Sequence, residues 1–438
     1  MKYFDLYLIF LKLIDMKKLL LFAGLFALVG LVQAQPMHVD GKLLKTATGN
    51  TIILRGMNYP IMDDGNVDLN NASSYQTLID QYAMTGANCI RIPWNTDGKH
   101  WRDGITPGTM QGYLTSGRLG EMIDYCFSKN LKVILEIHDL TCSNDWAAFN
   151  STIVPFWTST PVVNLINARQ SGLIVNIANE FGNDQNWGGD LNTFKTNYIT
   201  AVQALRVAGI TVPVMIDAPN CGTSSSSIVS IASQIVSADN LHNIIFSVHA
   251  YWSAYAAGNA QIDAKMNEMN ASNACYVFGE IANKQDIGSC GDADITGIYQ
   301  RVLTNACPMG IGWLAWCYNK DCAAAREASS TGMFANLTAF GNDLVNNSNY
   351  GLNSNSICNG QNGVPLGLGV GNNNAESTAK VKLYPNPGHG SFSFQSSETI
   401  KAVKVYDVTG REVTLKRLSL NLFEIESVQS VSTGWYMY

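Results

Sequence analysis

Two glutamates stand where hydrophobic runs end, and residues of this type in this position suit a pair of catalytic carboxylates. Glu180 closes the run LIVNIANE at 173–180, and Glu280 closes CYVFGE at 275–280. When one carboxyl is protonated and the other ionised, the first can give a proton to a leaving oxygen while the second attacks carbon. This division of labour is the chemistry of glycosidic bond hydrolysis. A salt-bridged Glu in an ordinary turn is the competing interpretation for either residue alone.

Further polar and aromatic side chains end other hydrophobic runs in the same way. A lone residue of this kind is more often a satisfied structural group than a catalyst. If the runs are parallel strands of one barrel, however, their carboxyl ends meet at one rim, where barrel enzymes keep their chemistry. The candidates for substrate binding at these ends are Arg91, His138, His249, Tyr251 and Trp316. For Glu136 and Asp217 we expect structural or supporting roles.

The elements that must position these side chains alternate along the chain. Short β-branched runs, with period-two alternation, are separated by amphipathic helical stretches such as 75–85, 118–129, 193–208 and 296–305. Eight such units favour a closed (β/α)8 TIM barrel over an open doubly wound sheet, and no GxGxxG follows the first strand to suggest a dinucleotide. The predicted strands are 52–57, 88–93, 132–138, 173–178, 212–217, 243–248, 275–279 and 311–316.

The expected neighbours of the two glutamates assign their roles. Arg91 and the hydroxyl of Tyr251 beside Glu280 would favour its charged form, whereas Glu180 has no cation beside it in this arrangement and could hold a proton. Glu280 is then the nucleophile and Glu180 the acid/base. On a barrel the two carboxyls would lie about 5 Å apart, which is the spacing of enzymes that retain anomeric configuration.

The ordered set of motifs resembles glycoside hydrolase family 5. That family carries Arg in an IRIP-like motif, His on strand three, Asn-Glu on strand four, His-x-Tyr on strand six, Glu on strand seven and Trp on strand eight. All occur here in order, between about 37 and 347. The resemblance implies that Asn179 holds the sugar 2-hydroxyl, that His249 and Tyr251 orient the catalytic carboxylates, and that Trp316 lies under the cleaved sugar.

Within that family, EIHDLTC, IVNIANE, VMIDAP and GWLAW are most similar to bacterial endo-β-1,4-mannanases. The chain departs from their pattern in NEFGNDQNW, at Tyr59-Pro60 and at Tyr318. An endo-β-1,4-glucanase is the alternative, because mannose and glucose differ in one hydroxyl. A non-catalytic carbohydrate-binding barrel and a metal-dependent hydrolase using Asp217, Glu180 and histidines are less favoured alternatives. We expect no metal and no cofactor.

Composition sets limits on partners and location. The 438 residues are 46% hydrophobic and 14% charged with a net charge of −6, so nothing suggests a nucleic acid partner, and a neutral β-1,4-linked polysaccharide is compatible. Residues 1–34 read as a secretory signal peptide, with translation starting at Met1 or Met16. A transmembrane anchor is the competing interpretation of this segment. We expect a secreted or cell-surface monomer.

Export makes disulfides possible for the ten cysteines. From the barrel arrangement we expect Cys317 to pair with Cys322 and Cys275 with Cys307, while Cys89 and Cys126 suit free buried thiols. Five tryptophans in the predicted loops suit either the cleft or the core. These are Trp101, Trp146, Trp157, Trp187 and Trp252.

The composition changes after the predicted catalytic domain, 35–358. Residues 359–379 are rich in Gly and Asn and read as a linker. Residues 380–438 alternate in short runs typical of a small β-sandwich. A sugar-binding module is one interpretation. The runs YPNPGHGSFSF, VKVYDVTGREV and GWYMY resemble instead a type IX secretion sorting domain. The resemblance implies that the secretion machinery is its partner. A lysine-bearing terminal strand is usual in that domain, whereas this sequence stops at Tyr438, so the domain is expected to be truncated.

Overall fold

The computed structural model describes residues 36–99, 105–254, 256 and 258–353, together with seven strands between 381 and 437. Contacts divide the chain into two units, residues 1–366 and 367–438. The predicted signal peptide, the linker and Trp101 lie outside the described residues. No helix among the described residues is long and apolar enough to span a membrane.

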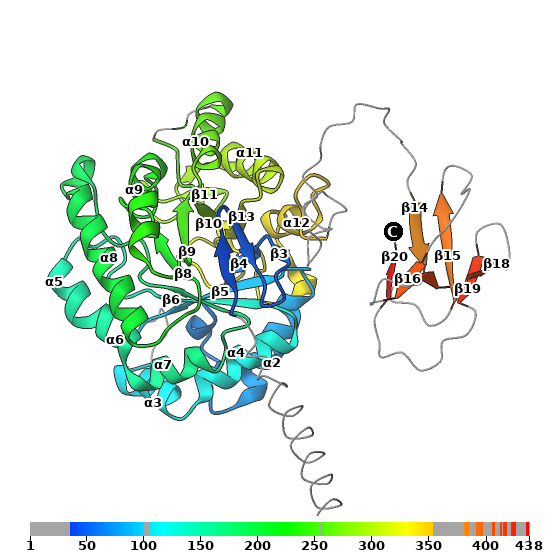
Figure 1. Ribbon diagram of the computed structural model, residues 1–438, viewed down its shortest axis with the longest axis horizontal. Coiled ribbons are helices and arrows are strands. Elements are labelled where there is room, and N and C mark those ends of the chain that lie inside the picture. Colours follow the sequence, from blue (N-terminus) through cyan, green and yellow to red (C-terminus); the bar gives the residue numbers. More distant parts are fainter. Residues whose placement is uncertain are drawn as a thin grey trace, which may run out of the picture. The chain divides into compact units, whose positions relative to one another are not determined.

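Eight parallel strands form a closed barrel in the first unit, which confirms the predicted (β/α)8 fold (Figure 1). Around the barrel the order is β10-β13-β4-β5-β6-β7-β8-β9, so the chain winds round it in sequence. The strands are β4 (Arg55–Asn58), β5 (Cys89–Trp94), β6 (Lys132–Ile137), β7 (Leu173–Asn176), β8 (Val214–Asp217), β9 (Ile244–His249), β10 (Cys275–Ile281) and β13 (Gly312–Ala315).

The first predicted strand, 52–57, is in fact divided between two sheets. Its beginning belongs to an antiparallel sheet of β1 (His38–Asp40), β2 (Leu43–Lys45) and β3 (Thr51–Ile52), and only β4 enters the barrel. Leu44 and Ile52 of this sheet pack with inward-facing barrel residues such as Ile134. The small sheet therefore contributes apolar side chains to the same core cluster.

Helices surround the barrel and connect its strands (Figure 1). Local sequence explains them well: α8 (Leu191–Val207) begins at Asp190, whose side chain accepts a hydrogen bond from the Thr193 amide, and buries one apolar stripe. The others are α2 (Ala72–Ala83), α3 (Pro107–Thr115), α4 (Arg118–Ser128), α5 (Trp146–Ala148), α6 (Val154–Thr158), α7 (Thr160–Asn167), α9 (Ser225–Ala238), α10 (Asn259–Ala271), α11 (Thr296–Ala306) and α12 (Ala339–Asn346).

Period-two alternation divides the strand residues between two cores. Ile90, Val133 and Val175 pack with the helices, whereas Ile134 and Ile174 belong to a separate cluster inside the barrel. The polar residues that follow the interior cluster on these strands therefore also point inward, as the sequence predicted.

Strand β10 breaks this alternation. Tyr276 and Phe278 pack with the helices, so strict alternation would turn Glu280 away from the barrel interior. The pairing register shifts after Phe278 on both sides of β10. A bulge of this kind re-aims the next side chain. Here it turns Glu280 toward the cavity, a step that the alternation in the sequence did not contain.

The described strands of the second unit form two antiparallel sheets. Their orders are β14-β15-β19-β18 and β17-β16-β20. This arrangement agrees with an all-β domain, while its packing as a sandwich stays a prediction. The strands are β14 (Val381–Tyr384), β15 (Ser391–Ser396), β16 (Val405–Asp407), β17 (Glu412–Val413), β18 (Leu415–Arg417), β19 (Leu422–Ile425) and β20 (Trp435–Met437).

Candidate active site

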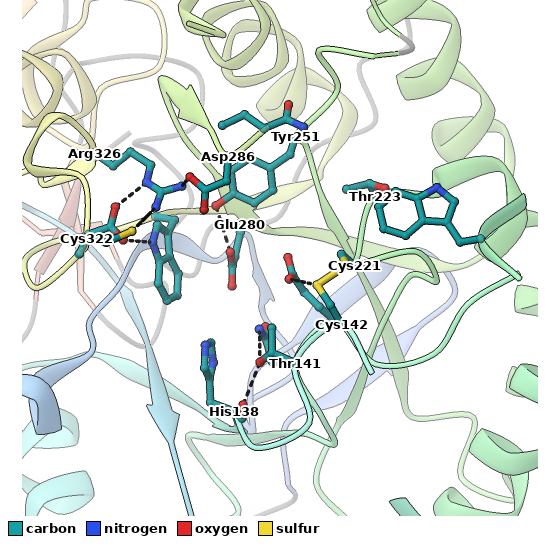
Figure 2. Close-up of a pocket in the computed structure, with 16 residues that line it drawn as sticks. His138, Thr141, Cys142, Cys221, Thr223, Tyr251, Glu280, Asp286, Cys322 and Arg326 are labelled. Atoms are coloured by element: carbon teal, nitrogen blue, oxygen red, sulfur yellow. Dashed lines mark hydrogen bonds and ion pairs between the residues drawn. A yellow bond between two sulfur atoms is a disulfide. The ribbon is translucent and has the colours of Figure 1, made fainter. Parts of the chain in front are cut away.

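A cavity of about 320 Å³ contains both predicted glutamates and most of the other candidates (Figure 2). Arg91 and His249 are fully buried and do not line it. The lining residues are His138, Thr141, Cys142, Asn179, Glu180, Trp187, Cys221, Thr223, Tyr251, Glu280, Gln285, Asp286, Trp316, Asp321, Cys322 and Arg326. The predicted convergence of these side chains at one place is therefore present.

Glu280 is held by two donors from different strands. Nη1 of Arg91 lies 3.0 Å from one carboxylate oxygen, and the hydroxyl of Tyr251 donates to the other at 3.0 Å. Burial nevertheless raises the pKa of Glu280 above its usual value, against the opposing charges of His249 and Arg91. Arg91 favours the charged form, as expected, but burial outweighs it because the Glu280 side chain is only 6% exposed.

Glu180 does not lie on β7, which ends four residues earlier at Asn176. It occupies the left-handed region, with φ of 50°. Its amide donates to Oδ2 of Asp217 at 2.9 Å, and its Oε1 lies 2.6 Å from Nδ1 of His249. Asp217 therefore has the supporting role expected for it, since it fixes the backbone of Glu180 from the neighbouring strand.

His249 lies between the two carboxylates, which corrects the expectation that Glu180 has no cation beside it. Its Nδ1 is 3.7 Å from Glu280, and its Nε2 is 3.5 Å from Asp217. Burial lowers the pKa of His249, but the charges of Glu280, Asp217 and Glu180 outweigh it and raise the pKa to about 9. An imidazolium thus faces both glutamates at neutral pH.

One oxygen of Glu180, one of Glu280 and a ring nitrogen of His249 all lie within 4.8 Å of one another. This separation agrees with the short distance expected of the pair. In enzymes that invert anomeric configuration the two carboxyl groups lie about 6.5–9.5 Å apart, because a water molecule must fit between one of them and the sugar.

Arg91 connects the strands beneath the cavity. Its guanidinium donates to side-chain oxygens of Asn58, Asn176 and Asn179 at 2.7–3.0 Å, besides Glu280. The surrounding carboxylates raise its already high pKa although burial opposes this. Sequence reasoning missed Asn58 and Asn176. Both end barrel strands, as the candidates do, and this signal could have identified them.

The remaining candidates form the wall beside Glu280. The ring of His138 stacks on Trp316 with centroids 5.8 Å apart, and His138 Nδ1 is 3.2 Å from both oxygens of buried Glu136. Trp316 donates its indole N–H to Asp321 at 3.2 Å. Asp321 is held by Arg326 in turn. Asp321 and Arg326 line the cavity and were not predicted.

The tryptophans differ in role. Trp157 and Trp252 are fully buried, and Trp146 packs edge-to-face on Phe181 and other aromatic rings. Trp187 is 51% exposed and lines the cavity. It is therefore the loop tryptophan, among those the structure describes, that can present a face to a sugar.

Both expected disulfides are wrong. Cys142 pairs with Cys221, Cys290 with Cys322, and Cys317 is a free buried thiol. Cys275 is also free and buried, although Cys307 is disulfide-bonded. The observed pairs join loops that follow different strands, and loop contacts of this kind cannot be read from strand positions. Cys89 and Cys126 are free buried thiols, as expected.

Three groups of potential metal ligands occur among the described residues. Two of them contain disulfide cysteines, whose sulfurs are not available as thiolates. The third is Glu180, His249 and Glu280. A histidine whose pKa is raised to about 9 carries a proton at neutral pH, and this positive charge opposes binding of a metal cation there.

A TIM barrel with two adjacent carboxylates in a cavity defines a class of protein, the barrel glycoside hydrolases. The cellulase family, glycosyl hydrolase family 5, matches residues 46–321. The chain belongs to this family. A secretion system C-terminal sorting domain matches residues 382–438, which indicates export.

Named relatives agree with this assignment. A mannan endo-1,4-beta-mannosidase from Cellvibrio japonicus is 31% identical over 342 residues, which cover 75% of this chain and 71% of the relative. A second mannan endo-1,4-beta-mannosidase, from Salipaludibacillus agaradhaerens, is 27% identical, and the match covers 70% of this chain and 90% of that relative. The fold resembles a β-mannanase from Streptomyces thermolilacinus solved with mannohexaose, with a TM-score of 0.59, 22% identity, and coverage of 74% and 96%.

Proposed function

We propose that the chain is a secreted, retaining endo-β-1,4-mannanase that hydrolyses mannan or glucomannan by double displacement. The observation that carries the mechanism is the pair Glu180 and Glu280, with oxygens within 4.8 Å and different hydrogen-bond partners. The substrate class is supported by the two relatives described above, both of which are mannan endo-1,4-beta-mannosidases.

In the first step Glu280 is the nucleophile. Arg91 and Tyr251 hold its carboxylate, and one oxygen forms a bond to the anomeric carbon of the sugar. The bond from that carbon to the leaving oxygen breaks as Glu180 gives this oxygen its proton. The new charge on Glu180 is stabilised by His249, whose ring nitrogen lies 2.6 Å away.

In the second step a water molecule occupies the place of the departed sugar. Glu180, now ionised, takes a proton from the water while the water oxygen bonds to the anomeric carbon and the ester to Glu280 breaks. Two inversions return the original configuration. Both glutamates end in the protonation states in which they began.

The cavity walls bind the sugar chain in this proposal. The indole of Trp316, fixed by Asp321 and stacked on His138, forms an apolar surface under the cleaved sugar. Asn179 is oriented by Arg91 at 2.7 Å and is the proposed partner of the 2-hydroxyl. Trp187 extends the binding surface on the side of Glu180, where the leaving sugar departs.

The remaining domain assignments are also proposals. Residues 1–34 would be a signal peptide, 35–358 the catalytic domain, 359–379 a linker and 380–438 the sorting domain. The catalytic unit acts as a monomer in this proposal.

The test measures reducing-sugar release by the catalytic unit on mannan, glucomannan, galactomannan and carboxymethylcellulose. We expect activity on the mannans, with products first formed in the β configuration by NMR. Glu280→Ala and Glu180→Ala should each lose about 10²-fold or more. Glu121→Ala is the control, since Glu121 lies on the surface in an ion pair with Arg118.

Other outcomes identify the alternatives. Activity on carboxymethylcellulose but not on mannan would make the chain a β-1,4-glucanase with the same mechanism. Binding without turnover would support the non-catalytic barrel. Loss of activity in chelator, restored by a divalent metal, would support the metal-dependent hydrolase, whereas full activity in chelator excludes it.

A further inference from the structure

A disulfide joins the loops on either side of the loop that carries Glu180, and the mechanism above does not use it. Cys142 belongs to the loop after β6, and Cys221 to the loop after β8. Strand β7, which precedes Glu180, lies between β6 and β8 in the barrel. Both cysteines line the cavity, and Figure 2 shows the bond between their sulfur atoms.

The two oxygens of Glu180 have different surroundings. Oε1 lies 2.6 Å from Nδ1 of His249, whereas Oε2 lies 3.2 Å from the sulfur of Cys142. A disulfide sulfur has no hydrogen to donate. In the part of the chain that the structure describes, no N–H or O–H group donates to Oε2. A proton can therefore be placed on Oε2 without breaking any hydrogen bond that Glu180 already makes.

The backbone around the disulfide is held in an unfavourable conformation. Among the described residues seven other than glycine have positive φ, and four lie here: Cys142, Glu180, Asn220 and Cys221, at 50° to 61°. Such conformations are unfavourable, persist only where the surrounding structure imposes them, and gather at active sites. Cross-links between the loops therefore have to hold this arrangement.

Hydrogen bonds connect the same three loops. The Gly182 amide donates to the carbonyl of Ser143 at 2.8 Å, and the Asn220 amide donates to that of Gly182 at 3.0 Å. The loop of Glu180 is thus attached on both sides, and the disulfide joins its two neighbours covalently. The covalent bond therefore spans the loop of the acid/base.

We propose that the Cys142–Cys221 disulfide is a positioning element of the acid/base, which holds the Glu180 carboxyl so that its transferable proton sits on Oε2. This inference rests on the proposed role of Glu180. The sulfur fills the space from which water or another donor would stabilise the ionised carboxylate. It thereby keeps Glu180 able to give its proton to the leaving oxygen.

Because the inference concerns a proton on Glu180, the charged and titratable groups near this side chain also have to be considered. His249 and Glu280 lie beside its carboxylate, Asp217 holds its amide, and Arg91 and Tyr251 bind Glu280. Removing the sulfurs changes none of these groups. It admits a donor to Oε2, so the proton transfer from Glu180 should weaken while the attack by Glu280 is unaffected.

The test replaces both cysteines by glycine, because glycine adopts the left-handed conformation at no cost. Cys142→Gly/Cys221→Gly is assayed on mannopentaose, whose leaving sugar needs a proton, and on dinitrophenyl β-mannobioside, whose leaving group does not. We expect kcat/KM to fall about 10-fold or more on the first and less than about 2-fold on the second, as for partial loss of general acid catalysis.

Two comparisons make the result decisive. Cys290→Ala/Cys322→Ala removes a second disulfide, of which Cys322 lines the cavity, and should leave the ratio of the two activities unchanged. Glu180→Ala should show the same selective loss as the glycine variant, but larger. If Glu180→Ala shows no dependence on the leaving group, the proposed function itself is wrong at this residue.

If Glu180→Ala behaves as expected but the glycine variant loses both activities equally, or neither, the disulfide has only a structural role and the inference fails. Should the glycine variant not fold, the folded native protein reduced with dithiothreitol is assayed on the same two substrates. The Cys290→Ala/Cys322→Ala and Cys307→Ala variants show how much of that change belongs to the other disulfides. An unchanged ratio after reduction also overturns the inference.

Discussion

Tyr251→Phe removes one hydrogen bond from the proposed nucleophile and changes little else. The Tyr251 hydroxyl donates to Oε2 of Glu280 at 3.0 Å, and Arg91 occupies the other oxygen. Burial and the charge of Glu280 raise the pKa of Tyr251 well above 10, so the hydroxyl stays a donor at every pH of interest. The variant leaves Oε2 without this partner.

The size of the effect follows from the charge on the acceptor. A hydrogen bond to a charged group contributes about 1.5–3 kcal/mol, which is about 10-fold to 150-fold in rate if it is lost entirely in the transition state. The charge on Glu280 decreases as its oxygen bonds to carbon, so the bond itself weakens there. The loss in rate comes instead from the orientation of the attacking carboxylate, which this hydrogen bond fixes. We therefore expect kcat/KM at neutral pH to fall by about 10-fold.

The pH profile gives an independent measure. A donor stabilises the ionised carboxylate, so its loss raises the pKa of Glu280, which burial already raises. The nucleophile must be ionised, and the acidic limb of kcat/KM against pH should therefore move to higher pH. A loss of about 1.4 kcal/mol corresponds to about one pH unit.

The control is Tyr276→Phe on β10, the strand that carries Glu280. The Tyr276 hydroxyl donates to Ser272 at 3.1 Å and does not line the cavity. We expect a loss of stability of about 1 kcal/mol and unchanged activity per folded molecule. Unchanged kcat/KM together with an unmoved acidic limb in Tyr251→Phe would refute the assignment of Glu280 and Tyr251 as a functional pair.

Two further predictions concern affinity and stability. Trp187→Ala should raise KM on mannan polymers about 5-fold at similar kcat, because one stacking surface of about 1 kcal/mol is lost; an unchanged KM would show that this exposed indole does not bind sugar. Arg206→Ala should lower the free energy of unfolding in urea by about 3–5 kcal/mol, since it leaves buried Asp239 without its ion pair. The control is Arg301→Ala, which removes the partly exposed ion pair of Arg301 with Asp263. It should lower the free energy of unfolding by less than about 1 kcal/mol.

Much of the barrel could be predicted because its signals are local. Alternation along β5, β6 and β7 depends on neighbouring residues alone, and it correctly separated Ile90 and Val133 from Arg91. Apolar spacing over 193–208 indicated α8 for the same reason. The list of candidate side chains at the strand ends followed from these local patterns and from the order of the family motifs.

The sequence by itself therefore determined which residues end the strands and which chemistry they can do. Only the tertiary structure decided how they meet. Arg91 and Glu280 are 189 positions apart, and the bulge in β10, the left-handed turn at Glu180 and the placing of His249 between two carboxylates all depend on contacts between strands. The Cys142–Cys221 pair depends on where two loops pass each other. Such contacts are set by packing, which spacing along one chain does not encode.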